Sequence, residues 1–151
     1  MKELNIITQT RKNFLALVNS LSEDQLNSIP AWGKNNIAWN FGHIIATQQV
    51  LCYVRSGLPV NTDQWIIDKY QRGTKPEAFI NASEMDALKG ELFKMIEVLE
   101  KDLQAETFQN FEPFTTGYGV TLNNIIETVK FVSVHESLHY GVALTLKKSI
   151  S

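Results

Sequence analysis

The chain has 151 residues, of which 44% are hydrophobic and 20% are charged, and its formal net charge is −2. This length suits a single domain over residues 1–151 with a sizeable core. The balanced charge and the lack of a basic cluster argue against a nucleic acid or an anionic membrane as partner. Charges interrupt the N-terminal stretch MKELNIITQTRKNF, and no segment is apolar enough to span a membrane. We therefore expect a cytoplasmic protein.

Two helices are predicted before residue 58. Apolar residues three or four apart predict a helix over roughly the first twenty residues: Leu4, Ile7, Phe14, Val18 and Leu21. Ser22 followed by Gln25 resembles a capping box and predicts a short helical turn that ends at Pro30. Asn35 or Asn36 is expected to cap the second helix, which the sequence SGLP ends.

Two more helices follow a long connection, residues 58–82. Ser83 with Asp86 predicts the start of the third helix, whose apolar seam comprises Met85, Leu88, Leu92, Met95, Leu99 and Leu103. The fourth is expected to begin near Thr121 or Asn123. The connection is long enough to run the length of a helical bundle, so helices two and three can be parallel. We predict an all-α four-helix bundle.

Both long connections carry apolar residues. The sequence DQWIIDKY predicts a short amphipathic helix that packs Trp65 and Ile66 against the bundle. The later sequence AETFQNFEPFTTGYGV has no helical period and is expected to fold over an apolar surface. It would either cover the end of the bundle or form a mobile lid over a site.

The three histidines of the chain lie in apolar helical segments. His43 belongs to WNFGHII, and His135 and His139 belong to FVSVHESLHYG. Residues four apart on a helix are neighbours, so the latter two can direct nitrogens at one point on the core-facing seam. Buried imidazoles need polar partners, and a shared metal would satisfy one nitrogen of each. We predict a metal site; the alternative is three satisfied core histidines.

The same stretch spells H-E-x-x-H, in which Glu136 would be the general base of a zinc protease. No His, Asp or Glu follows His139, so such an enzyme's third ligand is missing, and we disfavour this function. Glu136 is the candidate catalytic residue, with a role that the sequence leaves open. The only cysteine, Cys52, excludes an internal disulfide and is expected to be a buried apolar residue.

A long connection between helices two and three, a histidine within helix two and H-x-x-x-H near the C-terminus together resemble the DinB-like four-helix metalloenzyme superfamily. The segment LSEDQLNSIPAWGKNNIAWNFGHII resembles its lead into helix two, and the resemblance extends over nearly the whole chain. It implies an up-down-down-up bundle, frequently dimeric, that binds zinc or nickel through His43, His135 and His139. It also implies transfers or isomerisations with a low-molecular-weight thiol such as bacillithiol, mycothiol or glutathione. Glu136 is not part of that pattern.

Three neutral imidazoles leave a metal position open for water or a thiol. The sequence therefore favours a metal-dependent enzyme acting on small electrophiles, either a thiol S-transferase or a hydrolase. A thiolate bound to the metal needs no general base, which favours transfer. The alternatives are a non-catalytic, stress-related metal-binding protein and a structural helical dimer.

Further residues have two interpretations each. Asn40, Glu127 and Thr128 either orient ligands or meet solvent at the rim of the bundle. Three aromatic residues either line a substrate pocket or pack in the core: Trp39, Tyr118 and Tyr140. Apolar faces on helices one and three predict a homodimer with a two-fold interface.

Overall fold

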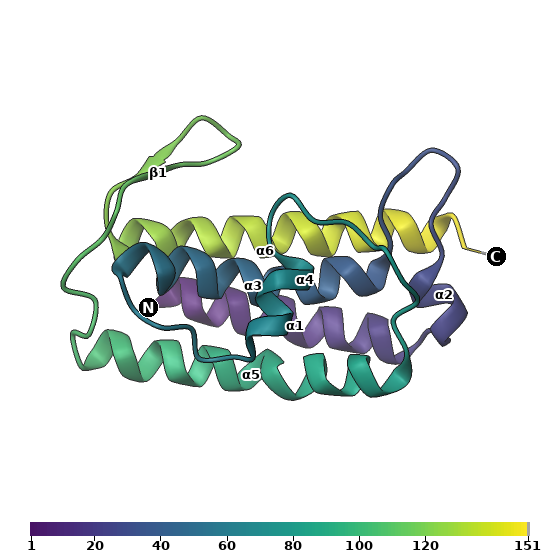
Figure 1. The fold of residues 1–151 in the computed structure, drawn as a ribbon, viewed down its shortest axis with the longest axis horizontal. Helices are drawn as coiled ribbons and strands as arrows, with labels where there is room; N and C mark the ends of the chain where they lie inside the picture. The colour runs from purple at the N-terminus through teal and green to yellow at the C-terminus, as the bar shows by residue number, and fades with distance from the viewer. Residues whose placement is uncertain (151) are drawn as a thin grey trace.

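The structure, a computed structural model that describes residues 1–150, is mostly helical. The helical elements are α1 (Lys2–Asn19), α2 (Glu23–Asn27), α3 (Ile37–Cys52), the 3-10 turn η1 (Val54–Ser56), α4 (Gln64–Tyr70), α5 (Ala82–Gln104) and α6 (Ile125–Lys148). Two short strands, β1 (Phe114–Thr115) and β2 (Thr121–Leu122), pair antiparallel. The four long helices α1, α3, α5 and α6 lie side by side (Figure 1), which confirms the prediction of a predominantly helical fold.

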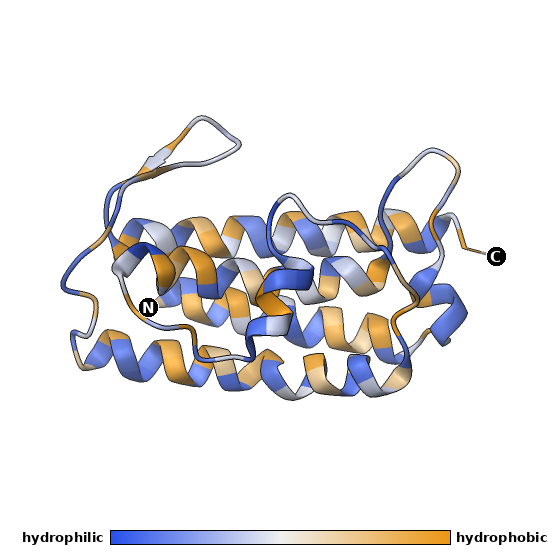
Figure 2. Ribbon diagram, viewed as in Figure 1, coloured by the Kyte–Doolittle hydropathy of each residue, from blue (hydrophilic) through white to orange (hydrophobic). Residues whose placement is uncertain are grey.

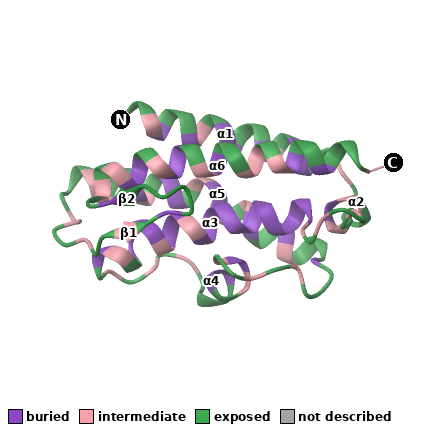
Figure 3. Cartoon of the chain, turned by 90° about the horizontal axis from the view of Figure 1, so that it is seen from above, coloured by how far each residue is buried: buried purple, intermediate pink, exposed green. Residues whose placement is uncertain are grey.

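Helix α3 lies at the centre of the packing. It contacts α1, α4, α5 and α6, and every residue from Ile37 to Ala46 is buried (Figure 3). A helix that is apolar on all sides is stable only inside a core. Phe41 and Ile44 expose no surface, and burial of each side chain contributes about 1.5–3 kcal/mol. A rigid, buried α3 therefore carries His43.

The outer helices have one apolar face each. Figure 2 shows hydrophobic and hydrophilic residues alternating along α1 and α5, as the spacing of their apolar residues predicts. Within residues 1–150, none of the helices has the length and apolar character needed to cross a membrane.

Side-chain caps fix where the helices begin. The Ser22 hydroxyl and the Gln25 side chain form the predicted capping box of α2. Asn36 caps α3 by accepting a hydrogen bond from the Trp39 N–H at 2.7 Å, which selects Asn36 over Asn35. Both capping predictions are confirmed.

Two predicted helix starts are wrong by a few residues. Asn81, not Ser83, caps α5, because Ile80 is tied to the Asn27 side chain by two hydrogen bonds and fixes where the chain enters the helix. Asn124 caps α6, and the preceding residues Thr121–Leu122 form β2 instead of helix.

The connection from α3 to α5 contains η1 and the short helix α4, which packs across α3. Ile66, Ile67 and Tyr70 are buried there, as the apolar pattern of DQWIIDKY predicts for Ile66. Trp65 is 38% exposed, so it is much less buried than Ile66.

The connection from α5 to α6 is not an irregular loop throughout. Phe114 pairs with Leu122 and Thr115 with Thr121, which makes a small hairpin that lies over α3 and α6 (Figure 3). The Glu112 N–H donates to the Arg55 carbonyl at 2.6 Å and ties the start of the hairpin to η1, the turn that follows α3. The hairpin therefore lies above the face of the bundle that carries the histidines.

Candidate metal centre

The fold brings the three histidines together. His135 and His139 lie one turn apart on α6 with ring centroids 4.4 Å apart, and the His43 ring on α3 is 5.1 and 4.5 Å from them. One nitrogen of each residue can be chosen so that all three lie within 4.8 Å of one another. His43 is buried and the other two are half-buried.

The tautomer of His43 is fixed by the backbone of α4. Its Nδ1 lies 2.7 Å from the carbonyl oxygen of Tyr70. A carbonyl only accepts hydrogen bonds, so Nδ1 carries the proton and Nε2 keeps a lone pair. The backbone of Tyr70 therefore prepares His43 Nε2 for a metal.

Gly42 allows this contact. A Cβ atom at Gly42 would lie 2.5 Å from the Tyr70 ring, closer than real Cβ atoms approach. The glycine lets α4 lie flat against α3, which brings the Tyr70 carbonyl to His43. The residue before the histidine is thus part of the site's construction.

Asn40 fixes the tautomer of His139. The Asn40 amide donates to the Asn36 carbonyl at 2.8 Å, which leaves its Oδ1 to accept from His139 Nδ1 at 2.7 Å. The proton is therefore on Nδ1 of His139, and its Nε2 is free to bind a metal. Asn40 is fully buried, so it orients a histidine and does not meet solvent.

Glu127 and Thr128 do not contact the histidines. Glu127 accepts from the Asn123 N–H at 2.8 Å, and the Thr128 hydroxyl donates to the Asn124 carbonyl. Both residues form hydrogen bonds that stabilise the first turn of α6. Of the three polar residues predicted as possible ligand orienters, the structure brings only Asn40 to the site.

His135 differs from the other two because its Nδ1 is buried without a hydrogen-bond partner among the described residues. Burial, together with the neighbouring His139 and His43, lowers the pKa of His135 to about 2. Burial and the nearby His43 also lower the pKa of His139 to about 4, and burial lowers the pKa of His43. All three imidazoles are neutral at pH 7, which is the form that binds metals.

Glu136 faces away from the histidines. Its carboxylate accepts from Arg11 Nε at 3.0 Å and from a terminal nitrogen of Arg11 at 2.6 Å, and both side chains are buried. Arg11 also donates to Gln48 at 3.1 Å and to the Leu92 carbonyl. Burial raises the pKa of Glu136, and the Arg11 charge opposes that shift. This network leaves Glu136 no access to the histidine cluster.

A cavity of about 350 Å³ opens onto the histidines. Its walls come from α3, α6, the segment after α4 and the hairpin; they are His43, Thr47, Val50, Leu51, Arg55, Gln71, Arg72, Phe114, Thr116, Gly117, Tyr118, Phe131, His135 and His139. The volume is in the range of small-molecule sites. The hairpin thus forms one wall of a pocket whose floor is the histidine cluster.

The three aromatic residues considered from the sequence have different positions. Tyr118 lines the cavity and packs edge-on against Phe131. Trp39 stacks on His43 with ring centroids 4.4 Å apart, and Tyr140 packs against Phe14 in the core. The sequence did not predict that Arg55, Arg72, Phe114 and Phe131 line the cavity, because they lie in connections without periodic pattern or on a partly exposed helix face.

Cys52 is fully buried, and burial raises the pKa of its thiol to about 12. Thiol reactivity requires the thiolate, so this side chain is inert, as expected.

The donor set fits a divalent metal. His43 and His139 each have a lone pair on Nε2, and His135 has a buried nitrogen without a partner. Neutral imidazoles suit zinc and nickel, and three such ligands leave a position open toward the cavity.

Comparison with known proteins places the chain in a family. A search of curated proteins found no match. The sequence pattern of the DinB superfamily matches residues 6–143, a range that includes all three histidines, the whole of α3 and most of α6. The chain therefore belongs to the DinB superfamily.

Proposed function

We propose that this protein is a metal-dependent enzyme that transfers a low-molecular-weight thiol to small electrophiles. His43, His135 and His139 are the proposed ligands of one zinc or nickel ion. The observation that carries the proposal is the orientation of His43 by Tyr70 and of His139 by Asn40, which directs two lone pairs into the cluster. Superfamily membership and the cavity above the histidines are compatible with it.

The reaction proposed is a simple substitution or addition. A bound divalent metal supplies a Lewis acid that lowers the pKa of a thiol or water at its open position. In transfer, the thiol releases its proton to solvent and its sulfur forms a bond to carbon of the electrophile. In a substitution the leaving group departs with its electron pair; in an addition the electron pair of the broken π bond takes up a proton from solvent. The chain contributes the three imidazoles and a pocket that orients the electrophile.

Hydrolysis is the second candidate. It normally uses a general base beside the metal. No Asp or Glu is among the residues that line the cavity, and Glu136 is held by Arg11. This composition favours thiol transfer over hydrolysis, and it leads us to propose a structural role for Glu136.

Metal content tests the site first. We expect about one zinc or nickel ion per chain in protein purified without added metal, and none after His135→Ala. Ser137→Ala is the matched control, because it also lies on α6 but bonds only to the Ser133 carbonyl. Full metal loading of a variant with all three histidines replaced by alanine would refute the site and with it the function.

Cobalt substitution tests the chemistry. Glutathione or another small thiol should shift the visible spectrum of the cobalt protein, and a panel of electrophiles should be consumed only when thiol is present. Metal loading without turnover of any electrophile would favour the non-catalytic alternative. Rapid hydrolysis of esters or amides without thiol would replace transferase by hydrolase.

We further propose the up-down-down-up arrangement of the superfamily and a homodimer. The first is supported by Figure 1, where α1 and α6 run toward the end marked C while α3 and α5 run the opposite way. The second is supported by exposed apolar side chains one turn apart on α6, Val134 at 48% and Leu138 at 46% exposure. The apolar seam of α5 is buried in the core, so it is not available for a dimer interface. Light scattering should give a dimer mass, and Leu138→Glu should give the monomer.

A further inference from the structure

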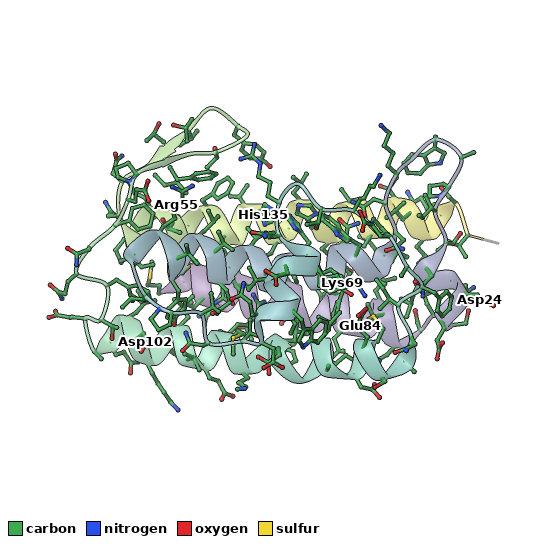
Figure 4. The ribbon with its side chains drawn as sticks, viewed as in Figure 1. Asp24, Arg55, Lys69, Glu84, Asp102 and His135 are labelled. Atoms are coloured by element: carbon green, nitrogen blue, oxygen red, sulfur yellow. The ribbon has the colours of Figure 1, made fainter. Side chains whose placement is uncertain are left out.

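Two arginines line the cavity above the histidines. Arg55 comes from η1 and Arg72 from the segment that follows α4. Their guanidinium carbons lie 4.6 and 5.9 Å from the centre of the Phe114 ring in β1. Figure 4 shows Arg55 beneath the hairpin and His135 on the same side of the bundle, nearer its middle. Two parts of the connection between α3 and α5 thus bring positive charges to one part of the pocket.

The pocket contains no negative charge to balance them. None of the residues that line it is Asp or Glu. Within residues 1–150, Arg72 forms no ion pair, and Arg55 has only Glu112 at 3.6 Å. The Glu112 side chain is 77% exposed, so this pair contributes little. The wall of the pocket is therefore electropositive.

Packing of the hairpin does not explain both arginines. One guanidinium over Phe114 is enough for a cation–π contact that holds β1 in place. A second guanidinium at the same ring adds repulsion between like charges. An anionic group between the two would remove that repulsion, and the planar guanidinium matches the oxygens of carboxylate and phosphate.

We propose that the pocket binds a small organic molecule with an anionic oxygen group, a carboxylate or a phosphate, and that Arg55 and Arg72 bind that group. The remainder of the molecule would lie along Phe114, Tyr118 and Phe131 with its reactive end toward the histidines. This inference rests on the proposed function for the role of the histidines, but the anion site itself needs no metal. It assigns the class of substrate or thiol that the enzyme accepts.

Three compounds of similar size test the proposal: phenylacetate, phenylacetamide and phenyl phosphate. Calorimetric titrations use zinc-loaded protein and are repeated after removal of zinc with a chelator, because a carboxylate can also bind a metal directly. We expect at least one of the two anions to bind roughly tenfold more tightly than the neutral amide in both preparations. The stronger of the two anions identifies the group as carboxylate or phosphate.

Variants locate the binding. Arg72→Gln and Arg55→Gln should each remove most of the preference for the anion and leave binding of phenylacetamide unchanged. Lys75→Gln is the matched control, since it removes the same charge three residues after Arg72 but does not line the cavity. Circular dichroism confirms that the variants are folded.

Equal affinity for the anions and the amide would overturn the proposal. So would an anion preference that survives both arginine substitutions, or one that disappears with the metal. Loss of the metal site in the earlier test would leave these titrations interpretable, so the two proposals fail separately.

Discussion

His135 and Glu136 are adjacent in sequence, but α6 directs them into two different environments. Glu136 lies in the core, where Arg11 neutralises its charge, and Gln48 and the Leu92 carbonyl accept further hydrogen bonds from that arginine. His135 lies at the cavity, and its Nδ1 has no partner among the described residues. The fold supplies hydrogen-bond partners for Glu136, whereas His135 keeps a nitrogen that can bind a ligand from outside the chain.

The difference separates stability from function. A buried ion pair in which every guanidinium nitrogen is hydrogen-bonded holds four helices together, because Arg11 is on α1, Glu136 on α6, Leu92 on α5 and Gln48 on α3. A buried nitrogen without a partner costs free energy unless a ligand satisfies it. The glutamate of H-E-x-x-H therefore stabilises the helical bundle, and the two histidines of that motif face the cavity, where they can bind a ligand.

The largest expected effect on stability comes from breaking the ion pair. Glu136→Gln should lower the free energy of unfolding by about 3–5 kcal/mol, because it leaves the Arg11 charge buried without its partner. The double variant Arg11→Met with Glu136→Met should recover most of this loss, since it removes both charges. Urea denaturation measures both variants. A fully stable single variant with low activity would instead give Glu136 a catalytic role.

Asn40→Ala tests the other environment. It should weaken metal binding by about 10- to 100-fold, because His139 loses the acceptor that fixes its tautomer. Gln49→Ala is the matched control: it is also a buried amide on α3, but it bonds to the Asn61 N–H away from the histidines. Both variants should lose stability, and only the first should lose affinity for zinc in a competition titration. Equal affinities would remove Asn40 from the site.

Local patterns in the sequence predicted the helices and the histidines well. Spacing of four placed His135 and His139 on one face of α6, and Asn36 capped α3 as its side chain allows. These predictions depend on interactions between residues close in sequence. Caps and regularly spaced apolar residues occur in most amphipathic helices, so they can be recognised in a sequence before the three-dimensional structure is known.

Contacts between distant residues left no such pattern. Asn40, which bonds to His139, lies 99 residues before it. Arg11, which bonds to Glu136, lies 125 residues before it. Asn40 occurs in an apolar helix, where its side chain could equally have met solvent. Arg11 occurs in a helix with other charged residues, and only the packing of α1 against α6 places it in the core. The supporting residues of both environments therefore required the structure.

Gly42→Ala probes how closely α4 must approach α3. The added methyl group would collide with the Tyr70 ring, so we expect a loss of about 1–3 kcal/mol in the free energy of unfolding and weaker metal binding. Gly90→Ala on α5 is the control, because nothing lies within 4 Å of its Cβ position. There the higher helix propensity of alanine should add up to about 1 kcal/mol. Similar results for both variants would mean that the Tyr70 carbonyl is not needed to position His43.

The smallest expected effect is that of pH on metal affinity. Three histidines with the ordinary pKa of 6.5 would be mostly protonated at pH 5.5, and their affinity for a metal would fall roughly 10²- to 10³-fold between pH 7 and pH 5.5. Here burial lowers the pKa of all three, to about 4 for His139 and about 2 for His135. A lowered pKa means that the neutral, metal-binding form persists to lower pH. Cobalt titrations at pH 7 and pH 5.5 should therefore differ by less than about tenfold. A hundredfold loss of metal affinity by pH 5.5 would show that solvent reaches the imidazoles as freely as on an exposed helix. The histidine cluster would then differ from the enclosed Arg11–Glu136 pair in its exposure to solvent, and not in its lack of hydrogen-bond partners.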